Sequence, residues 1–412
     1  MRQPLILQRI LARRDAAPSG EGWRSPIVML MLMVVAMELS HATWFTLLNN
    51  FAVNEVDFTG REIGILQSVR EIPGFLSFAA VLLLVFIREQ RLALVSLLLL
   101  AVGTASTGYL PYEYAFYATT LLMSLGFHYY ETMAQSLSLQ WLPKERAAHG
   151  LGKIVAAASF AAIAAYCLVG GLKYAGVDFR HIYLIAGGLT LAITCWLFLA
   201  FPVFPEKVAQ RKTLVLKSRY WLYYALVFMS GARRQIFLVF AGFMMVEKFG
   251  YSVEAIALLF IVNHAFNMVL APQIGKLIIR FGERKALMLE YIGLIGVFAT
   301  YAFVTDPTVA AVLYVVDHAF FAIAIAIKTY FQKIASPEDI APTAGVAFTI
   351  NHIAAVFLPV MLGFVWLQSP SAVFLLGAAM AATSLLLSVM IPRAPVEGHE
   401  TIFARRGMQP AE

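Results

Sequence analysis

Two adjacent arginines, Arg233 and Arg234, lie in the middle of a long apolar stretch, YYALVFMSGARRQIFLVFAGFMMV. A guanidinium group is permanently charged, and its planar fork of N–H donors fits a carboxylate or a phosphate. The pair therefore favours recognition of a small organic anion. The alternative is a structural salt bridge to a buried acid, for which the candidates are Glu38, Glu71 and Asp317.

Other ionisable residues also fall at the centres of apolar stretches. An ionisable side chain at the bilayer centre costs about 2.5–3.5 kcal/mol on insertion scales, so it is expected to face a protein interior or an aqueous cavity. An anion arriving at an arginine can change the protonation of a nearby carboxylate, and histidine can extend a proton relay. The alternative role for the acids is neutralisation of the cations. The predicted proton-coupling residues are Glu38, Glu131, Asp317 and His318.

The remaining polar residues at these depths complete the predicted site. Arg70 and Glu71, beside Pro73, are expected to form a structural or gating pair, and Lys153, nearer a helix end, is expected to be a gate residue. The predicted substrate-binding set is Arg233, Arg234, His41, His128, Trp44, Asn263 and His264.

A metal site is the alternative use of the histidines. Methionine and histidine recur at i+4 spacing, and thioether and imidazole are ligands that Cu(I) prefers. The arginines would repel a cation, so we predict no metal and keep a copper carrier as the alternative. Its candidate ligands are Met33, Met37, His41, His264 and Met268.

Composition places these residues in a membrane. Of 412 residues, 60% are hydrophobic and 13% are charged, with a mean hydropathy of +0.76, whereas a soluble protein carries about a quarter charged residues. We find no Walker motif, phosphate-binding glycine loop or HEXXH motif. We therefore expect an all-α integral membrane protein that is neither an enzyme nor an ATP-driven pump.

Spanning helices need about 20 mostly apolar residues each. With proline, glycine and charge clusters as breaks, the sequence predicts twelve spans. They are 26–50, 62–87, 92–110, 114–141, 148–172, 181–204, 220–246, 252–278, 286–304, 308–334, 342–367 and 371–391.

The distribution of basic residues predicts the orientation. The termini, the even-numbered loops and the central linker hold 22 lysines and arginines, and the odd-numbered loops hold 4. Basic loops stay cytoplasmic, so we expect both termini and the linker in the cytoplasm and the protein in a bacterial-type inner membrane. This asymmetry explains the net charge of +7, and no nucleic-acid role is predicted.

The two halves of the chain resemble each other at an offset of about 193 residues. FTGREIGILQSVREIPGF (58–75) aligns with YSVEAIALLFIVNHAFNM (251–268), and Arg233 aligns with Ser40. A parallel repeat predicts a pseudo-twofold axis along the membrane normal. The expected organisation is a basic N-terminal tail (1–25), a six-helix bundle (26–204), a cytoplasmic linker (205–219), a second six-helix bundle (220–391) and a C-terminal tail (392–412).

One loop carries a family signature. GKLIIRFGERKAL (275–287) resembles the loop motif of the major facilitator superfamily, with isoleucine at the usual aspartate, whereas FIREQRLAL (86–94) lacks both glycines. The resemblance implies two bundles that gate a central cavity lined by spans 1, 4, 7 and 10, with the loop residues in gating. The gating residues that match are Gly275, Arg280, Gly282 and Arg284.

Together these features predict a secondary transporter that works by alternating access. We expect it to move a small organic anion, with the proton gradient as its energy source and no cofactor. The expected partners are the small-molecule substrate and the lipid bilayer, and the expected state is a monomer. Export of lipids or drugs is a further alternative, and a non-transporting receptor with this fold is disfavoured by the mid-membrane charges.

Overall fold

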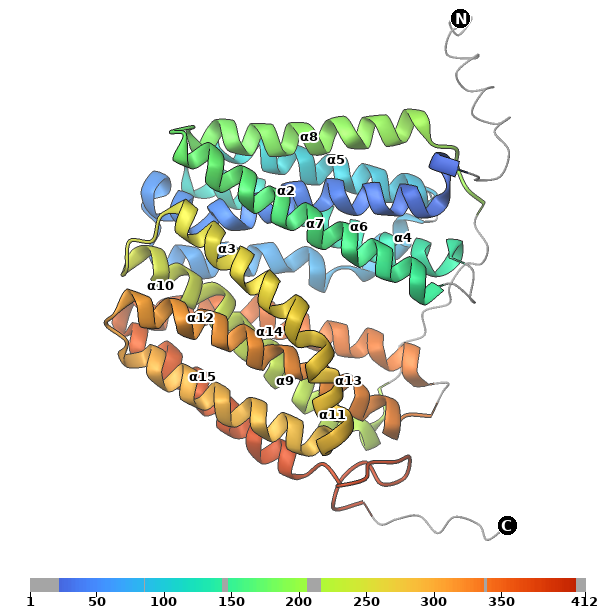
Figure 1. The fold of residues 1–412 in the computed structure, drawn as a ribbon, viewed down its shortest axis with the longest axis vertical. Helices are drawn as coiled ribbons and strands as arrows, with labels where there is room; N and C mark the ends of the chain where they lie inside the picture. Colours follow the sequence, from blue (N-terminus) through green and yellow to red (C-terminus); the bar gives the residue numbers. More distant parts are fainter. Residues whose placement is uncertain (1–21, 85, 143–146, 206–215, 337–338, 405–412) are drawn as a thin grey trace, which may run out of the picture. The chain divides into compact units, whose positions relative to one another are not determined.

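The structure is a computed structural model in which we describe residues 22–84, 86–142, 147–205, 216–336 and 339–404. Most of the two predicted tails and most of the linker lie outside these residues. Across the described residues, helices form the whole regular structure apart from one isolated bridge between Val396 and His399. The helices divide into two compact units, residues 1–51 with 72–210 and residues 52–71 with 211–412 (Figure 1).

Unit 1 is held together by close helix contacts. Small residues let backbones approach: a Cβ at Gly126 would lie 2.3 Å from the backbone nitrogen of Leu100, and one at Gly103 would lie 2.5 Å from that of Met123. The helices of this unit are most of α2 (Pro26–Val56), α4 (Phe78–Leu83), α5 (Glu89–Thr107), α6 (Glu113–Trp141), α7 (Ala147–Tyr174) and α8 (Phe179–Ala200).

Unit 2 contains the helices of the second half and the greater part of α3. Ser252, Asp306 and Ser369 cap helix starts, each accepting a hydrogen bond from a backbone N–H in the first turn. The helices are α3 (Gly60–Phe75), α9 (Trp221–Gln235), the π-helical η4 (Ile236–Ala241), α10 (Gly242–Glu247), α11 (Val253–Phe303), α12 (Pro307–Phe321), the short 3-10 turn η5 (Ala322–Ala324), α13 (Ile325–Ile334), α14 (Ile340–Gln368) and α15 (Pro370–Val389).

These elements correspond to the twelve predicted spans. Within the described residues, nine helical stretches are long and apolar enough to cross a membrane. The other three spans are α6, α3 with α4, and the first part of α11, whose Val253–Asn267 is a shorter apolar helix. The span formed by α3 and α4 is less apolar because α3 holds Arg70 and Glu71. The span formed by α6 is less apolar because it holds His128 and Glu131.

Spans 8 and 9 run through one long helix, α11, with a single break. Gly282 has φ +79° and ψ 162°, a backbone conformation that glycine adopts without a steric penalty. The prediction of a loop from 279 to 285 was therefore too long, because one glycine is enough to turn the chain.

The first part of α3, up to Glu71, packs against α14. This packing explains why residues 52–71 belong to unit 2, although the sequence placed them in the first bundle. A Cβ at Gly64 would lie 2.3 Å from the carbonyl oxygen of Pro359, and one at Gly60 would overlap the ring of Trp366. The hydroxyl of Ser68 also accepts a hydrogen bond from the backbone N–H of Val360 at 3.1 Å.

A polar network joins the start of α9 to the start of α14. Asp339 accepts hydrogen bonds from Lys217 Nζ at 2.8 Å, from the Tyr220 hydroxyl at 2.7 Å and from Arg219 Nη2 at 3.2 Å. The hydrogen bond from Lys217, followed by that from Tyr220, lowers the pKa of the Asp339 carboxyl. The same network lowers the pKa of Glu397, which accepts a hydrogen bond from Ser336.

Candidate functional site

The two arginines sit at the end of the regular part of α9 and face different surroundings. The guanidinium of Arg233 is only 1% exposed, whereas Arg234 is exposed. Adjacent residues on an α-helix point about 100° apart, which accounts for the difference. The helix continues as the π-helical segment η4, and π-bulges inside α-helices are frequent at functional sites.

Arg233 lies in a cluster of buried charges within unit 2. Its Nη2 atom is 3.6 Å from Oε1 of Glu290, and its guanidinium carbon is 4.5 Å from the centre of the Tyr291 ring. Asp317, which is 3% exposed, interacts electrostatically with both Arg233 and Glu290. We call Arg233, Glu290 and Asp317 the buried triad.

Arg234 lies beside a group of polar and aromatic side chains of the same unit. It interacts electrostatically with His318, as does His264. The Asn263 amide nitrogen is 3.3 Å from Nδ1 of His318, and the rings of Phe237 and His318 are 5.5 Å apart. We call Arg234, Asn263, His264 and His318 the arginine face. The structure thus brings together four residues that the sequence analysis selected separately.

Unit 1 carries two acids on different helices. Glu38 of α2 and Glu131 of α6 interact electrostatically, and Tyr166 of α7 also interacts with Glu38. Glu131 is exposed and Glu38 is partly buried. We call Glu38 and Glu131 the acid pair. The ring of His41, one turn along α2, stacks on Phe127 at 4.2 Å.

Two residues of the predicted substrate-binding set are buried in unit 1. Trp44 has no exposed surface and packs against Phe116 with ring centres 6.5 Å apart and a tilt of 52° between the ring planes, and His128 is 5% exposed. In this structure Trp44 belongs to the bundle core, and it does not enter the site proposed below.

The predicted gating residues fall into two groups. Arg70 contacts Glu71 and donates a hydrogen bond to Gln67 at 2.6 Å, and Glu71 lies 3.7 Å from Nε2 of His352. These residues fix α3 against α14. In the other group, Gly275 is helical, Arg280 and Lys153 are exposed, Arg284 is partly buried and Gly282 forms the break in α11.

The two methionines of α2 proposed for copper serve the packing of unit 1, whereas His264 belongs to the arginine face of unit 2. Met33 and Met37 are 0% and 6% exposed, and the sulfur of Met29, one turn away, accepts a hydrogen bond from Gln90 at 3.4 Å. The side chain of Met268 lies outside the described part of the structure. No observation here favours a copper site over an apolar core.

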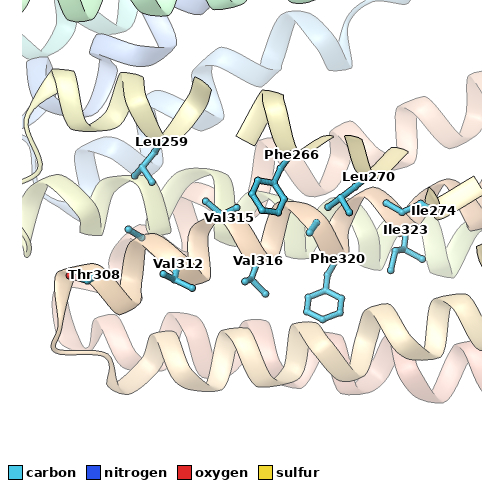
Figure 2. Close-up of a pocket in the computed structure, with 12 residues that line it drawn as sticks. Leu259, Phe266, Leu270, Ile274, Thr308, Val312, Val315, Val316, Phe320 and Ile323 are labelled. Atoms are coloured by element: carbon cyan, nitrogen blue, oxygen red, sulfur yellow. The ribbon is translucent and has the colours of Figure 1, made fainter. Parts of the chain in front are cut away.

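Unit 2 also contains an apolar cavity of 610 Å³ between α11 and α12 (Figure 2). Its α11 wall consists of Leu259, Phe266, Leu270 and Ile274, and Val312, Val315, Val316 and Phe320 line the α12 side. Among the described residues that line it, Thr308 alone has a polar side chain, so this cavity suits an apolar ligand and not an anion.

The chain was compared with known families and structures. Residues 28–359 match the sequence model of the Major Facilitator Superfamily. The protein belongs to this superfamily. The fold is similar to that of a mutant of the nucleoside transporter NupG, with a TM-score of 0.75 and 16% identity over 89% of this chain and 99% of that one. A bacterial homologue of the human lysosomal transporter Spinster has a TM-score of 0.67 and 14% identity over 88% and 94% of the chains.

No curated protein matches this sequence. The superfamily assignment confirms the prediction of an all-α membrane transporter with twelve spanning helices in two pseudo-symmetric six-helix bundles. At 14–16% identity, the structural neighbours establish the fold alone.

Glu290 is the residue that the sequence analysis passed over. It is 0% exposed and pairs with Arg233. The repeat offset contains the missing signal, because Glu290 aligns with Leu97, which is also 0% exposed in unit 1. A buried arginine requires an acid nearby, and the offset identifies the position that could supply it.

Proposed function

We propose that this transporter moves a small organic anion and couples the movement to protons, with Arg234 as the counter-charge for the anion. The observation that carries the proposal is the contrast within the adjacent pair: Arg233 is buried against Glu290, whereas Arg234 is exposed beside polar side chains. An exposed guanidinium can contact a ligand from solvent, and hydrogen bonds to charged groups contribute about 1.5–3 kcal/mol each.

The arginine face contains the groups that such a ligand needs. Arg234 supplies the charge, Asn263 supplies amide N–H donors, and His264 and His318 can donate or accept according to their protonation. Phe237 provides an apolar surface next to His318. This arrangement fits a carboxylate or phosphate attached to a small apolar or aromatic body.

The acid pair supports proton coupling. Glu38 on α2 and Glu131 on α6 interact electrostatically, and Glu131 is exposed. His41, which stacks on Phe127, lies one turn from Glu38. We assign the proton to Glu38 and Glu131, and the basic-residue asymmetry supports cytoplasmic termini in a bacterial-type inner membrane.

A ligand screen tests the anion assignment. Purified protein is melted with lactate, succinate, citrate, phosphate, uridine monophosphate and uridine, because a ligand that binds the folded state raises its melting temperature in a concentration-dependent way. We expect at least one of the anions to stabilise the wild type and Arg234→Ala to lose that shift, with a 10- to 100-fold or larger fall in affinity, as expected from about 1.5–3 kcal/mol.

Arg180→Ala is the matched control, since Arg180 is an exposed arginine paired with Asp178 at the start of α8. It should keep the stabilisation. Stabilisation by uridine alone, or an anion response that survives in Arg234→Ala, would contradict the proposal.

The apolar cavity of unit 2 favours a second candidate, export of a lipid or an apolar drug. Its volume of 610 Å³ lies within the range of small-molecule sites, about 300–1,000 Å³. Leu270→Trp would fill it. A fluorescent apolar probe that binds the wild type but not this variant, together with no anion response, would support this candidate over the first.

A further inference from the structure

The buried triad has two acids for one base. Arg233, Glu290 and Asp317 are 1%, 0% and 3% exposed, and Asp317 interacts electrostatically with both other members. Arg233 Nε donates to the Met229 carbonyl oxygen at 3.2 Å. Among the described residues, neither oxygen of Glu290 nor Oδ1 of Asp317 has a hydrogen-bond partner.

The helices around the triad offer few other charges, and α13, which packs against α9 and α11, contributes the exposed Lys328. On α9 the remaining cation is the exposed Arg234, α14 contributes His352, which is paired with Glu71, and α15 has no titratable residue. The nearby groups of α11 and α12 are Tyr291, Tyr301, Tyr314 and His318. With both acids ionised, the cluster would therefore hold a net negative charge in a core that water does not reach.

Burying an unbalanced ion costs several kcal/mol even after relaxation. One proton on either carboxyl group leaves one carboxylate opposite one guanidinium and removes that cost. The protonated carboxyl also gains an O–H donor, which neither acid has when it is ionised.

The fold does not need these charges. At the offset of 193 residues, Arg233, Glu290 and Asp317 align with Ser40, Leu97 and Ser124 of unit 1. Those three are 0%, 0% and 1% exposed and neutral. Because the equivalent positions of the first bundle are filled without ionisable groups, a purely architectural role does not account for the triad.

We propose that Glu290 and Asp317 share one exchangeable proton beside Arg233, so that the core of the second bundle is a proton site in addition to the acid pair of the first. Arg233 is the positioning residue, because it stabilises whichever carboxyl is ionised. The inference rests on the proposed proton-coupled function and adds Glu290 to the residues that serve it.

Infrared spectroscopy of the purified, ligand-free protein at neutral pH tests the shared proton. We expect the spectra of wild type minus Glu290→Gln and of wild type minus Asp317→Asn each to contain the C=O stretch of one protonated carboxyl group, with equal areas. Either substitution leaves the other acid ionised opposite Arg233, so each removes the same proton.

Glu89→Gln is the matched control. Glu89 is a buried carboxylate that accepts hydrogen bonds from Gln140 at 2.7 Å and Ser136 at 3.0 Å, and its neutralisation should leave that band unchanged. A band lost in only one triad variant would show that the acid left in the other variant keeps its proton beside Arg233, which contradicts the balance of one carboxylate against one guanidinium, and no band in either would show two ionised acids. Both results overturn the proposal.

Transfer of the wild type into D2O tests exchange. The band should shift to lower frequency, and a band that does not shift would contradict an exchangeable proton. If Glu290→Gln does not fold, Glu290→Asp keeps the acid and should retain the band, and Asp317→Asn still tests the loss. Because no substrate is used, failure here is separate from failure of the anion screen.

Discussion

Aligned positions of the two bundles carry different chemistry. In unit 1, Ser40 donates a hydrogen bond to Thr190 at 2.8 Å, whereas the aligned Arg233 of unit 2 pairs with Glu290 at 3.6 Å. A second pair of contacts repeats this contrast near the basic loops. Gln140 donates to Glu89 at 2.7 Å in unit 1, and the aligned Lys333 forms an ion pair with Glu283 at 2.7 Å in unit 2.

The difference shows which features the fold requires and which it only accommodates. A neutral hydrogen bond satisfies Ser40 and a neutral amide stands at Gln140, so helix packing in the first bundle does not demand a cation at either position. Buried ion pairs are weak evidence for stability, because desolvation can exceed the Coulombic gain. The charged version in the second bundle is therefore better explained by function, and substitutions that interchange the two chemistries test this explanation.

The largest effect is expected from removing both acids of the buried triad. Glu290→Gln combined with Asp317→Asn leaves Arg233 unpaired in the core, which should lower the free energy of unfolding by about 3–5 kcal/mol. Thermal melting in detergent measures the loss. Each single variant keeps one partner for Arg233 and should remain folded. A double variant as stable as the wild type would mean that Arg233 does not depend on these acids.

Removing all three charges of the buried triad, as in the first bundle, is expected to leave the stability of the protein unchanged or to raise it. Arg233→Met, Glu290→Leu and Asp317→Ser together remove all three charges while keeping most of the volume at positions 233 and 290. Replacing buried ion pairs by apolar residues is often neutral or stabilising by about 1–4 kcal/mol. We expect a melting temperature at or above that of the wild type, and an unfolded triple variant would assign the triad to the fold.

The polar network at the start of α14 should respond to pH. Hydrogen bonds from Lys217 and Tyr220 lower the pKa of Asp339, so its contribution is complete above the unfolded-state pKa of about 4 and is lost as pH falls through the lower folded-state pKa. Asp339→Asn should therefore lower the melting temperature by a few degrees at pH 7, and the difference should shrink below about pH 4.

Asp178→Asn in unit 1 is the control for this pH series. Asp178 forms an exposed pair with Arg180 at 3.4 Å, and such pairs contribute little. Its melting curve should follow the wild type at every pH. A constant difference between wild type and Asp339→Asn down to pH 3 would contradict the assignment.

The smallest effect on stability is expected from the ion pair between Lys333 and Glu283. Lys333→Gln places in unit 2 the amide that Gln140 supplies in unit 1. The Lys333 side chain is 50% exposed, and exposed ion pairs contribute about 0.2–1 kcal/mol. The melting temperature of Lys333→Gln should therefore lie close to that of the wild type. The remaining difference should fall further at high salt because exposed charges are screened.

The order of the helices and the location of the charges could be predicted from the sequence. Hydropathy determines spans because an unsatisfied backbone is not tolerated in lipid, and the repeat offset aligns Arg233 with Ser40. The same reasoning selected Arg234, Asn263, His264 and His318 from three different helices, which the structure places beside one another in unit 2.

The tertiary structure alone decided which arginine is buried and which acid it pairs with. Spacing predicts that Arg233 and Arg234 diverge, but only the packing of α9 against its neighbours determines which side chain is covered. Glu290 is 57 residues from Arg233, and its depth depends on a single glycine, Gly282, that shortens the loop before it. Sequence thus determined the membrane topology and the inventory of charges, because these follow from local hydropathy. Three-dimensional packing decided their pairing, because pairing depends on distances between helices that local pattern does not contain.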